Sequence, residues 1–344
     1  MSAWGHGVLD EHVGAVAAMD GIAVRAGDTD RLRLGPRLFD VIDTGDPMPS
    51  GRDAVVVREQ VKRDGADVLI EHPVAPGRHV RQRGEDLVTG DLLLAAGTML
   101  RPLDVAAAGA GGHTHLPVRR RPRVVVIPTG DEIRPLGSPT AAGEVLDTNS
   151  LMLIAQAVAA GATASAVDIV PDDPGALTAA VQQAVTTADL VVIGAGSSAG
   201  RDDHTAAVVA ALGTVVVHGV AVRPGHPVLL GVVAGVPVLG SPGYPVSAWL
   251  TFELLAVPLL AALLGTAPPR RTRVRAPLAV DVDSPAGLDD WVRVALVDGR
   301  AMPLPGGAGS LGQLAAAEGL LLVPAGVTGH SAGDPVEIVL LRPT

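Results

Sequence analysis

The feature that most constrains the fold is an alternation of short β-branched runs with helical patterns between residues 123 and 264. Within the strand pattern 123–127, residues 124–127 are continuously apolar, which is typical of a strand buried on both faces of a sheet. Helical and strand patterns then alternate at 149–160, 163–169, 175–187, 190–193, 203–211 and 214–217, before strands at 228–232 and 236–239 and a long helix at 245–264. This alternation predicts a three-layer α/β domain with a mostly parallel sheet.

The flanking regions have different patterns. Residues 19–102 combine Gly and Pro with short β-like runs, which predicts a small β-rich domain. Residues 103–121 begin as an Ala- and Gly-rich helical piece and end as a basic linker. From residue 268 onward β-like runs return without a long helix, which predicts a second β domain. A chain of 344 residues is long for one core, so this multidomain α/β organisation is expected.

Composition excludes several functions. The net charge of −10 argues against a nucleic-acid partner. The absence of cysteine excludes disulfides, thiolate metal sites and a cysteine nucleophile. The N-terminus lacks the pattern of a signal peptide, and the apolar stretch 248–265 contains Glu253 and Pro258 and is barely long enough to cross a membrane. We therefore expect a cytoplasmic protein without a membrane span.

Candidate ligand-binding loops follow four strand patterns of the predicted sheet. Asp131 and Glu132 follow the first strand, and a Gly/Ser-rich loop at 194–200 follows the third. The turn 222–227 and the loop 241–247 follow later strands. Because open α/β sheets bind ligands outside the carboxyl ends of their strands, we expect the four loops to form one site.

Each loop also has a simpler interpretation. Asp202 and Ser247 could be helix caps, and the polar residues of the turn could be solvated. A dinucleotide site is disfavoured, because the glycine spacing departs from the strict pattern and no carboxylate closes the strand at 214–217. A serine-hydrolase site is disfavoured too, because Ser197, Asp203 and His204 are too close in sequence and no nucleophile elbow is present.

Taken together, the loops resemble those of the molybdopterin molybdenumtransferases, the molybdenum insertases that are similar to the E domain of gephyrin. The resemblance runs in order along the chain through 18–21 (Ala-Met-Asp-Gly), 44–47 (Thr-Gly-Asp-Pro), 84–86 (Gly-Glu-Asp), 128–132 (Pro-Thr-Gly-Asp-Glu), 147–150 (Asp-Thr-Asn-Ser), 194–203, 223–227 (Arg-Pro-Gly-His-Pro) and 242–247 (Pro-Gly-Tyr-Pro-Val-Ser).

The resemblance implies a protomer of four parts. These are a short, elongated helical linker domain split between 1–18 and 103–121, a β-rich inserted domain at 19–102, a molybdopterin-binding-like α/β domain at 122–265, and a C-terminal β barrel at 268–344. It also implies a homodimer, whose active site lies between the α/β domain of one protomer and the β-rich domain of the other.

The implied reaction is the insertion of molybdate into adenylylated molybdopterin, with Mg²⁺, to give molybdenum cofactor and AMP. An upstream adenylyltransferase that supplies the pterin substrate is a further expected partner. The resemblance implies catalytic roles for Asp20, Asp86, Glu132 and Asp203, and metal binding by Glu85, Asp86, Asp131 and Asp203. It implies ligand binding by Thr129, Gly130, Asp131, Asn149, Gly196, Ser197, Ser198, Arg223, His226, Pro242, Pro245 and Ser247, with Arg293 and Ser310 completing the oxyanion pocket.

Several positions depart from the family pattern and indicate a divergent branch with a shortened N-terminus. Ala195 and Arg201 replace a usual glycine and a usual acidic residue, and Tyr244 replaces a usual asparagine. His226 stands where the family has a lysine, so that its charge at neutral pH is only partial. These departures leave open an alternative, a non-catalytic or altered paralogue that binds molybdopterin, molybdate or a partner protein.

Overall fold

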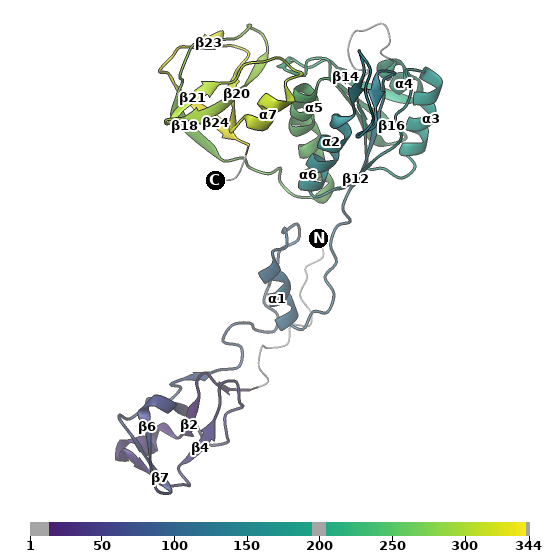
Figure 1. Ribbon diagram of the computed structural model, residues 1–344. Coiled ribbons are helices and arrows are strands. Elements are labelled where there is room, and N and C mark those ends of the chain that lie inside the picture. Colours follow the sequence, from purple (N-terminus) through teal and green to yellow (C-terminus); the bar gives the residue numbers. More distant parts are fainter. Residues whose placement is uncertain (1–13, 195–203, 342–344) are drawn as a thin grey trace. The chain divides into compact units, whose positions relative to one another are not determined.

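The computed structural model of the chain describes residues 14–194 and 204–341. The chain divides into two compact units, Met1–Val118 and Arg119–Thr344. The larger unit contains both the α/β region and the C-terminal strands (Figure 1).

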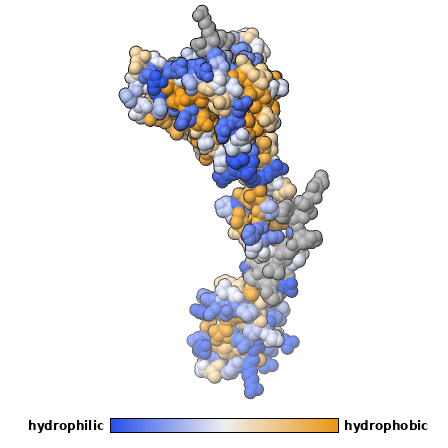
Figure 2. Space-filling view, turned by 90° about the vertical axis from the view of Figure 1, so that its right-hand side faces the viewer, coloured by the Kyte–Doolittle hydropathy of each residue, from blue (hydrophilic) through white to orange (hydrophobic). Residues whose placement is uncertain are grey.

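The smaller unit is built from short antiparallel strands. Two three-stranded sheets have the orders β4-β2-β5 and β3-β7-β6, and β1 pairs with β8. Their buried aliphatic side chains form two clusters, a larger one that includes Ile22, Leu34 and Val56 and a smaller one that includes Ala23 and Val55. Hydrophilic residues cover most of the face of this unit that Figure 2 shows, around a smaller hydrophobic area. The strands are β1 (Val16–Ala17), β2 (Gly21–Val24), β3 (Arg33–Leu34), β4 (Phe39–Ile42), β5 (Ala54–Val57), β6 (Val61–Asp64), β7 (Asp67–Ile70) and β8 (Val80–Arg81).

The smaller unit ends with the helix α1 (Pro102–Ala110). Pro102 occupies the first turn, where its missing N–H leaves no hydrogen bond unmade. The Asp104 carboxylate accepts hydrogen bonds from the backbone N–H of Arg101 at 2.8 Å and from its guanidinium at 2.8 and 3.0 Å. These hydrogen bonds lower the pKa of Asp104 from 3.8 to about 2. They fix the first turn of α1.

A six-stranded sheet with the order β12-β9-β13-β17-β16-β14 organises the larger unit. Strands β12, β9, β13 and β17 are parallel, whereas β16 is antiparallel to both of its neighbours. The sheet is therefore mixed, because a hairpin joins β16 to β17. The strands are β9 (Arg123–Pro128), β12 (Thr163–Ala166), β13 (Leu190–Gly194), β14 (Gly213–His218), β16 (Leu229–Val233) and β17 (Val236–Ser241).

Helices cover both faces of this sheet. Alternate residues of the central strands point to opposite faces, so that Val192 packs with α2 (Thr148–Ala159) and Ile193 with α3 (Pro174–Ala184) and α4 (Thr205–Leu212). Figure 1 shows α3 and α4 on one side of the sheet and α2, α5 and α6 on the other. The expected α/β layering is present, and the continuous apolar strands are explained by burial on both faces.

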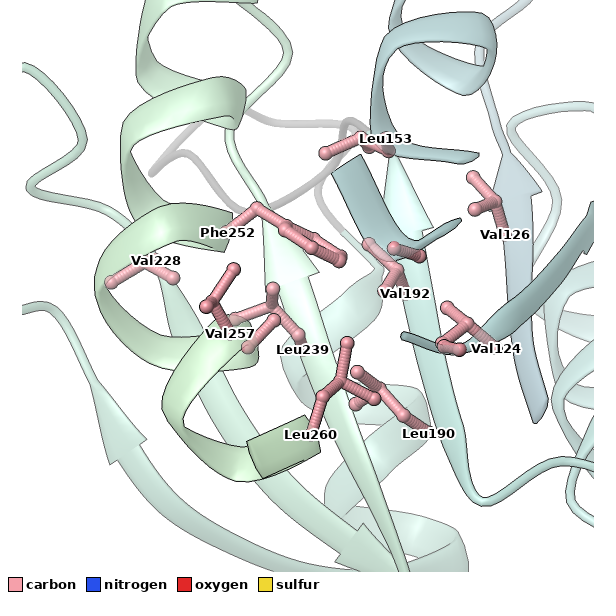
Figure 3. Packing of buried hydrophobic residues seen from close by; sticks show 13 residues of the cluster. Val124, Val126, Leu153, Leu190, Val192, Val228, Leu239, Phe252, Val257 and Leu260 are labelled. Atoms are coloured by element: carbon pink, nitrogen blue, oxygen red, sulfur yellow. The ribbon is translucent and has the colours of Figure 1, made fainter. Parts of the chain in front are cut away.

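One continuous helical segment, Pro245–Leu264, is long and apolar enough to span a membrane by length and composition. It consists of α5 (Pro245–Thr251), a π-helical turn (Phe252–Ala256) and α6 (Val257–Leu264). Phe252 and Leu260 are fully buried and point at the sheet residues Leu190 and Val192 (Figure 3). The apolar face of the segment is therefore part of the core of the α/β domain.

The C-terminal strands form a second sheet with the order β15-β20-β22-β24-β18, with β21 also paired to β20. A bridge between Leu278, just after β18, and Ala301 of β21 closes the sheet on itself. The elements are β18 (Arg273–Pro277), β19 (Val282–Asp283), β20 (Asp289–Val297), β21 (Arg300–Pro303), α7 (Leu311–Ala316), β22 (Gly319–Val323), β23 (Gly329–His330) and β24 (Pro335–Leu340). Strand β15 (Val222–Arg223) comes from the α/β domain and runs parallel to β20, which links the two domains.

Candidate functional site

A cavity of about 810 Å³ opens at the carboxyl ends of β9, β13 and β17. Pro128 and Gly194, the last residues of β9 and β13, line it together with the loop that begins at Pro242 after β17. From β9 the chain goes to β12 on one side and then to β13 on the other, so this edge is the topological switch point of the sheet. The loops predicted to converge after β9 and β17 do meet at this cavity.

Apolar side chains form most of the cavity wall, and the polar ones cluster at the start of α2. Asp147 caps this helix by accepting the Ser150 N–H at 2.9 Å. The Asn149 amide donates to the carbonyl of Gly243 at 2.7 Å, while its own Oδ1 is buried without a partner among the described residues. The lining residues are Val126, Pro128, Glu132, Ile133, Val145, Leu146, Asp147, Thr148, Asn149, Ser150, Leu153, Gly194, Pro227, Pro242, Gly243, Tyr244, Pro245, Ser247, Gly309 and Leu311.

Two aspartates face each other at the end of β9. The Asp131 N–H donates to Asp172 Oδ2 at 3.2 Å, and the Asp172 N–H donates to Asp131 Oδ1 at 3.2 Å. The buried hydroxyl of Thr129 donates to Asp172 Oδ1 at 3.1 Å. Gly130 has a φ of +147°, a backbone conformation that residues with a side chain rarely adopt. Only glycine therefore allows the sharp turn that places Asp131 beside Asp172.

Sequence reasoning missed Asp172. The stretch 172–174 (Asp-Asp-Pro) directly precedes the helix predicted at 175–187, and Asp173 caps α3 by accepting the Ala176 N–H at 2.7 Å. A second aspartate beside the cap, directly after a strand pattern, was the available signal.

Arg223 and His226 do not line the cavity. The guanidinium of Arg223 contacts both carboxylate oxygens of Asp290, at 3.1 Å from Nε and 2.7 Å from the terminal nitrogen. Asp290 is buried, 3% exposed, and also accepts the Ser284 hydroxyl at 3.1 Å. His226 Nδ1 donates to the carbonyl of Val220 at 2.8 Å, since a carbonyl oxygen can only accept. Both side chains thus hold the turn 222–227 in place.

Arg293 acts on the cavity through a loop. It is 8% exposed, and its guanidinium donates to the carbonyls of Gly306, Gly307 and Ser310. Burial lowers the pKa of Arg293. The same loop contributes Gly309 to the cavity wall. Arg293 therefore positions the loop that forms this part of the cavity wall, because its guanidinium donates hydrogen bonds to the backbone carbonyls of the loop.

The other predicted acidic residues lie in the smaller unit. Asp20 accepts the backbone N–H and the hydroxyl of Thr44, each at 2.8 Å, and these bonds lower its pKa. Glu85 accepts the N–H of Gln82 at 3.0 Å, and Asp86 is exposed. Because β1 and β8 are antiparallel, the chain that leads to Glu85 leaves their ladder at the end opposite Asp20. Asp20 therefore follows one end of this two-residue ladder in the smaller unit, and Glu85 and Asp86 follow the opposite end.

Four predicted residues, Gly196, Ser197, Ser198 and Asp203, lie outside the described residues, as do Ala195 and Arg201. Within the described ranges, no three His, Asp or Glu side chains gather as a metal site. Mg²⁺ needs fewer protein ligands than that, since it is commonly held by one or two carboxylates, substrate phosphates and water. The facing carboxylates of Asp131 and Asp172 fit this requirement.

The fold and the cavity define a class of protein, an α/β ligand-binding domain with a β domain on each side of it in sequence. Comparison with known families gives the same division. Residues 125–262 match the family described as a probable molybdopterin binding domain. Residues 15–112 match the MoeA N-terminal region (domain I and II), and residues 275–341 match the MoeA C-terminal region (domain IV).

The chain is 34% identical to molybdopterin molybdenumtransferase 2 of Mycobacterium tuberculosis, over 94% of this chain and 87% of that protein. It is 30% identical to the molybdopterin molybdenumtransferase of Bacillus subtilis, over 97% of this chain and 85% of that one. The crystal structure of a molybdopterin biosynthesis MoeA protein from Pyrococcus horikoshii superimposes with a TM-score of 0.81 at 32% identity, covering 99% of this chain and 93% of that chain. The chain belongs to the molybdopterin molybdenumtransferase family, the transferases of molybdenum cofactor biosynthesis.

Proposed function

We propose that this protein inserts molybdate into adenylylated molybdopterin and releases AMP and molybdenum cofactor. The observation that supports this most directly is the cavity at the switch point, which has apolar walls and lies beside facing acidic groups. A planar organic ligand suits the apolar walls, while the carboxylates suit a cation that accompanies a phosphoanhydride.

In this proposal the start of α2 binds the organic part of the ligand. Thr148, Asn149 and Ser150 face the cavity from one short turn. Asn149 Oδ1 and the Ser150 hydroxyl are buried and lack a partner among the described residues. Because an unpaired buried polar group costs about 1–3 kcal/mol, a ligand that bonded to these groups would recover that cost.

Asp131 and Asp172 would hold a magnesium ion. Glu132, on the cavity wall, would help to position the adenylyl phosphate of the ligand. The ion would neutralise the negative charge that develops when the phosphoanhydride breaks. Asp203 remains a proposed member of this group from the resemblance. Asp20, Glu85 and Asp86 would reach it from the β-rich domain of a partner subunit.

The proposed oxyanion pocket for molybdate consists of Arg223, His226 and Ser247. Ser247 is buried and lines the cavity. The Arg223 side chain is 53% exposed, so N–H groups that Asp290 does not engage can still donate to an anion. Asp290 offsets much of the charge of Arg223, which favours hydrogen bonding over charge attraction in this pocket.

We also propose a cytoplasmic homodimer that receives its substrate from an adenylyltransferase. The smaller unit exposes several large apolar side chains in α1 and in the segment that precedes it in sequence, namely Leu92, Met99, Leu103 and Val105. A second copy that covered them would remove apolar surface from water. Analytical ultracentrifugation tests this point, and a monomer at all concentrations would contradict it.

The reaction itself is tested with purified protein, adenylylated molybdopterin, Mg²⁺ and molybdate. We expect AMP release that depends on molybdate and a product that reconstitutes an apo-molybdoenzyme. The alternative is a paralogue that binds without turnover, and the pairing of Arg223 with Asp290 is the observation that favours it. Saturable binding of the pterin substrate without AMP release would contradict insertion and support this alternative.

A further inference from the structure

The loop 242–245 is fixed from two sides at the mouth of the cavity. From one side, Asn149 donates to the carbonyl of Gly243 at 2.7 Å. From the other, the N–H of Val246 donates to the carbonyl of Ala308 at 2.9 Å. Pro242 and Pro245 restrict φ at both ends of the loop. The backbone of this loop therefore has little conformational freedom, and it fixes the position from which each side chain of the loop projects.

Tyr244 is the side chain that this loop presents. It lines the cavity and is 67% exposed. A Cβ on Gly309 would lie 3.4 Å from one edge carbon of its ring, so the Gly309 backbone supports that edge. Arg293 in turn holds the loop that contains Gly309. The ring is thus supported along one edge and remains largely open to solvent.

The other described residues that line the cavity offer no comparable surface. Among the described residues that line it, Tyr244 is the only aromatic one, and the other apolar walls are aliphatic. Residues 195–203, which follow Gly194 in the sequence, include no aromatic residue. An aromatic ring that is two-thirds exposed contributes little to the core, so burial does not explain its place here.

We propose that Tyr244 is a specificity-determining residue, whose ring stacks on a planar heteroaromatic ring of the ligand at the mouth of the cavity. The inference rests on the proposed function, which supplies a ligand with two such rings, the adenine and the pterin. Aromatic side chains stack on either ring system, because each has a π face. The site would thereby gain affinity for planar ligands that aliphatic walls alone do not give.

Calorimetric titration with AMP and, separately, with unsubstituted pterin tests the proposal. Tyr244→Leu keeps apolar bulk but loses the π face, and we expect it to weaken binding of at least one probe about tenfold. Tyr244→Phe keeps the ring and should bind within about twofold of the parent protein. The probe that is affected identifies the stacked ring. Equal affinity of the Leu variant and the parent protein for both probes overturns the proposal.

The chain contains a single tyrosine, which gives a second readout. Nitration by tetranitromethane reports on Tyr244 alone, and saturating AMP or pterin should slow it several-fold if the ring is covered. An unchanged nitration rate with both probes overturns the proposal. Neither measurement requires turnover, so failure of AMP release would contradict the proposed function and leave the stacking result intact.

Discussion

Asp290 shows why individual contacts of the site escape sequence reading. Its partner Arg223 lies 67 residues away in sequence, and the pair forms only because β15 joins β20 of the C-terminal domain. Asp172 and Asp131 are 41 residues apart and meet because two loops leave the same sheet edge. Residue types near strand ends could be predicted from the sequence. The partner of each of these residues depends on tertiary contacts between distant segments, and local sequence patterns do not predict such contacts.

The first prediction concerns Arg223→Ala. Without the guanidinium, the buried Asp290 keeps only the Ser284 hydroxyl as a partner among the described side chains. We expect a loss of about 2 kcal/mol in the free energy of unfolding, less than for a fully buried pair because Arg223 is half exposed. Chemical denaturation measures it. Arg223→Lys is the matched control, since it keeps the charge without the bidentate contact. Its free energy of unfolding should lie between those of the parent protein and Arg223→Ala.

Unchanged stability of Arg223→Ala together with lost molybdate-dependent AMP release would contradict the structural role. It would assign the guanidinium to the substrate anion instead.

The second prediction concerns the facing carboxylates. Asp131→Asn and Asp172→Asn should each raise the Mg²⁺ concentration needed for half-maximal AMP release by about tenfold or more, because a neutral amide is a poorer ligand for a hard cation. A magnesium titration of the rate measures this. Asp173→Asn makes the same change one residue away, at a helix cap where asparagine is equally suitable, and should leave the curve in place. If the magnesium curves of Asp131→Asn and Asp172→Asn both coincide with that of the parent protein, neither residue belongs to the metal site.

At the scale of elements, the sequence predicted the α/β region well. The patterns at 123–127, 149–160 and 190–193 correspond to β9, α2 and β13 within one residue at each end. Hydrophobic periodicity is strong there because each strand is buried on both faces. The π-helical turn at 252–256 was not predicted, and local patterns did not show which residues close the C-terminal sheet, although the family resemblance implied a barrel there. They arise from a proline-interrupted helix and from a non-local bridge, which periodicity does not show.

The third prediction concerns the start of α1. The folded pKa of Asp104, about 2, lies below its ordinary value of 3.8, so the carboxylate stabilises the folded turn above about pH 4. This contribution is lost as the pH falls from about 4 toward 2. Arg101→Ala removes the largest cause of the shift, the side-chain hydrogen bond, and should raise the pKa of Asp104 toward 3.8. An NMR titration of the carboxyl group measures it. The same low pKa in Arg101→Ala would show that the backbone N–H alone sets the value.

At the scale of the whole molecule, the proposed acidic residues are distributed over both compact units. Asp131, Glu132 and Asp172 belong to the larger unit, and Asp20 and Asp86 to the smaller one. The proposed dimer gives this distribution a function, because the smaller unit of one protomer would complete the cavity on the larger unit of the other. An isolated larger unit would then hold the cavity with only part of its acidic residues.

The last prediction tests this arrangement by subunit mixing. At a Mg²⁺ concentration well below the one that the Asp131→Asn protein needs for half-maximal activity, the Asp86→Asn and Asp131→Asn proteins should each be nearly inactive in AMP release. In a random mixture about half of the dimers are mixed, and each mixed dimer has one site with both aspartates intact. Activity should therefore recover to about one quarter of the parent level if two protomers build each site. A site built within one protomer leaves every site with one defect, so mixing restores nothing. Mixing either variant with itself is the control, and recovery that depends on exchange time would trace the activity to newly formed dimers.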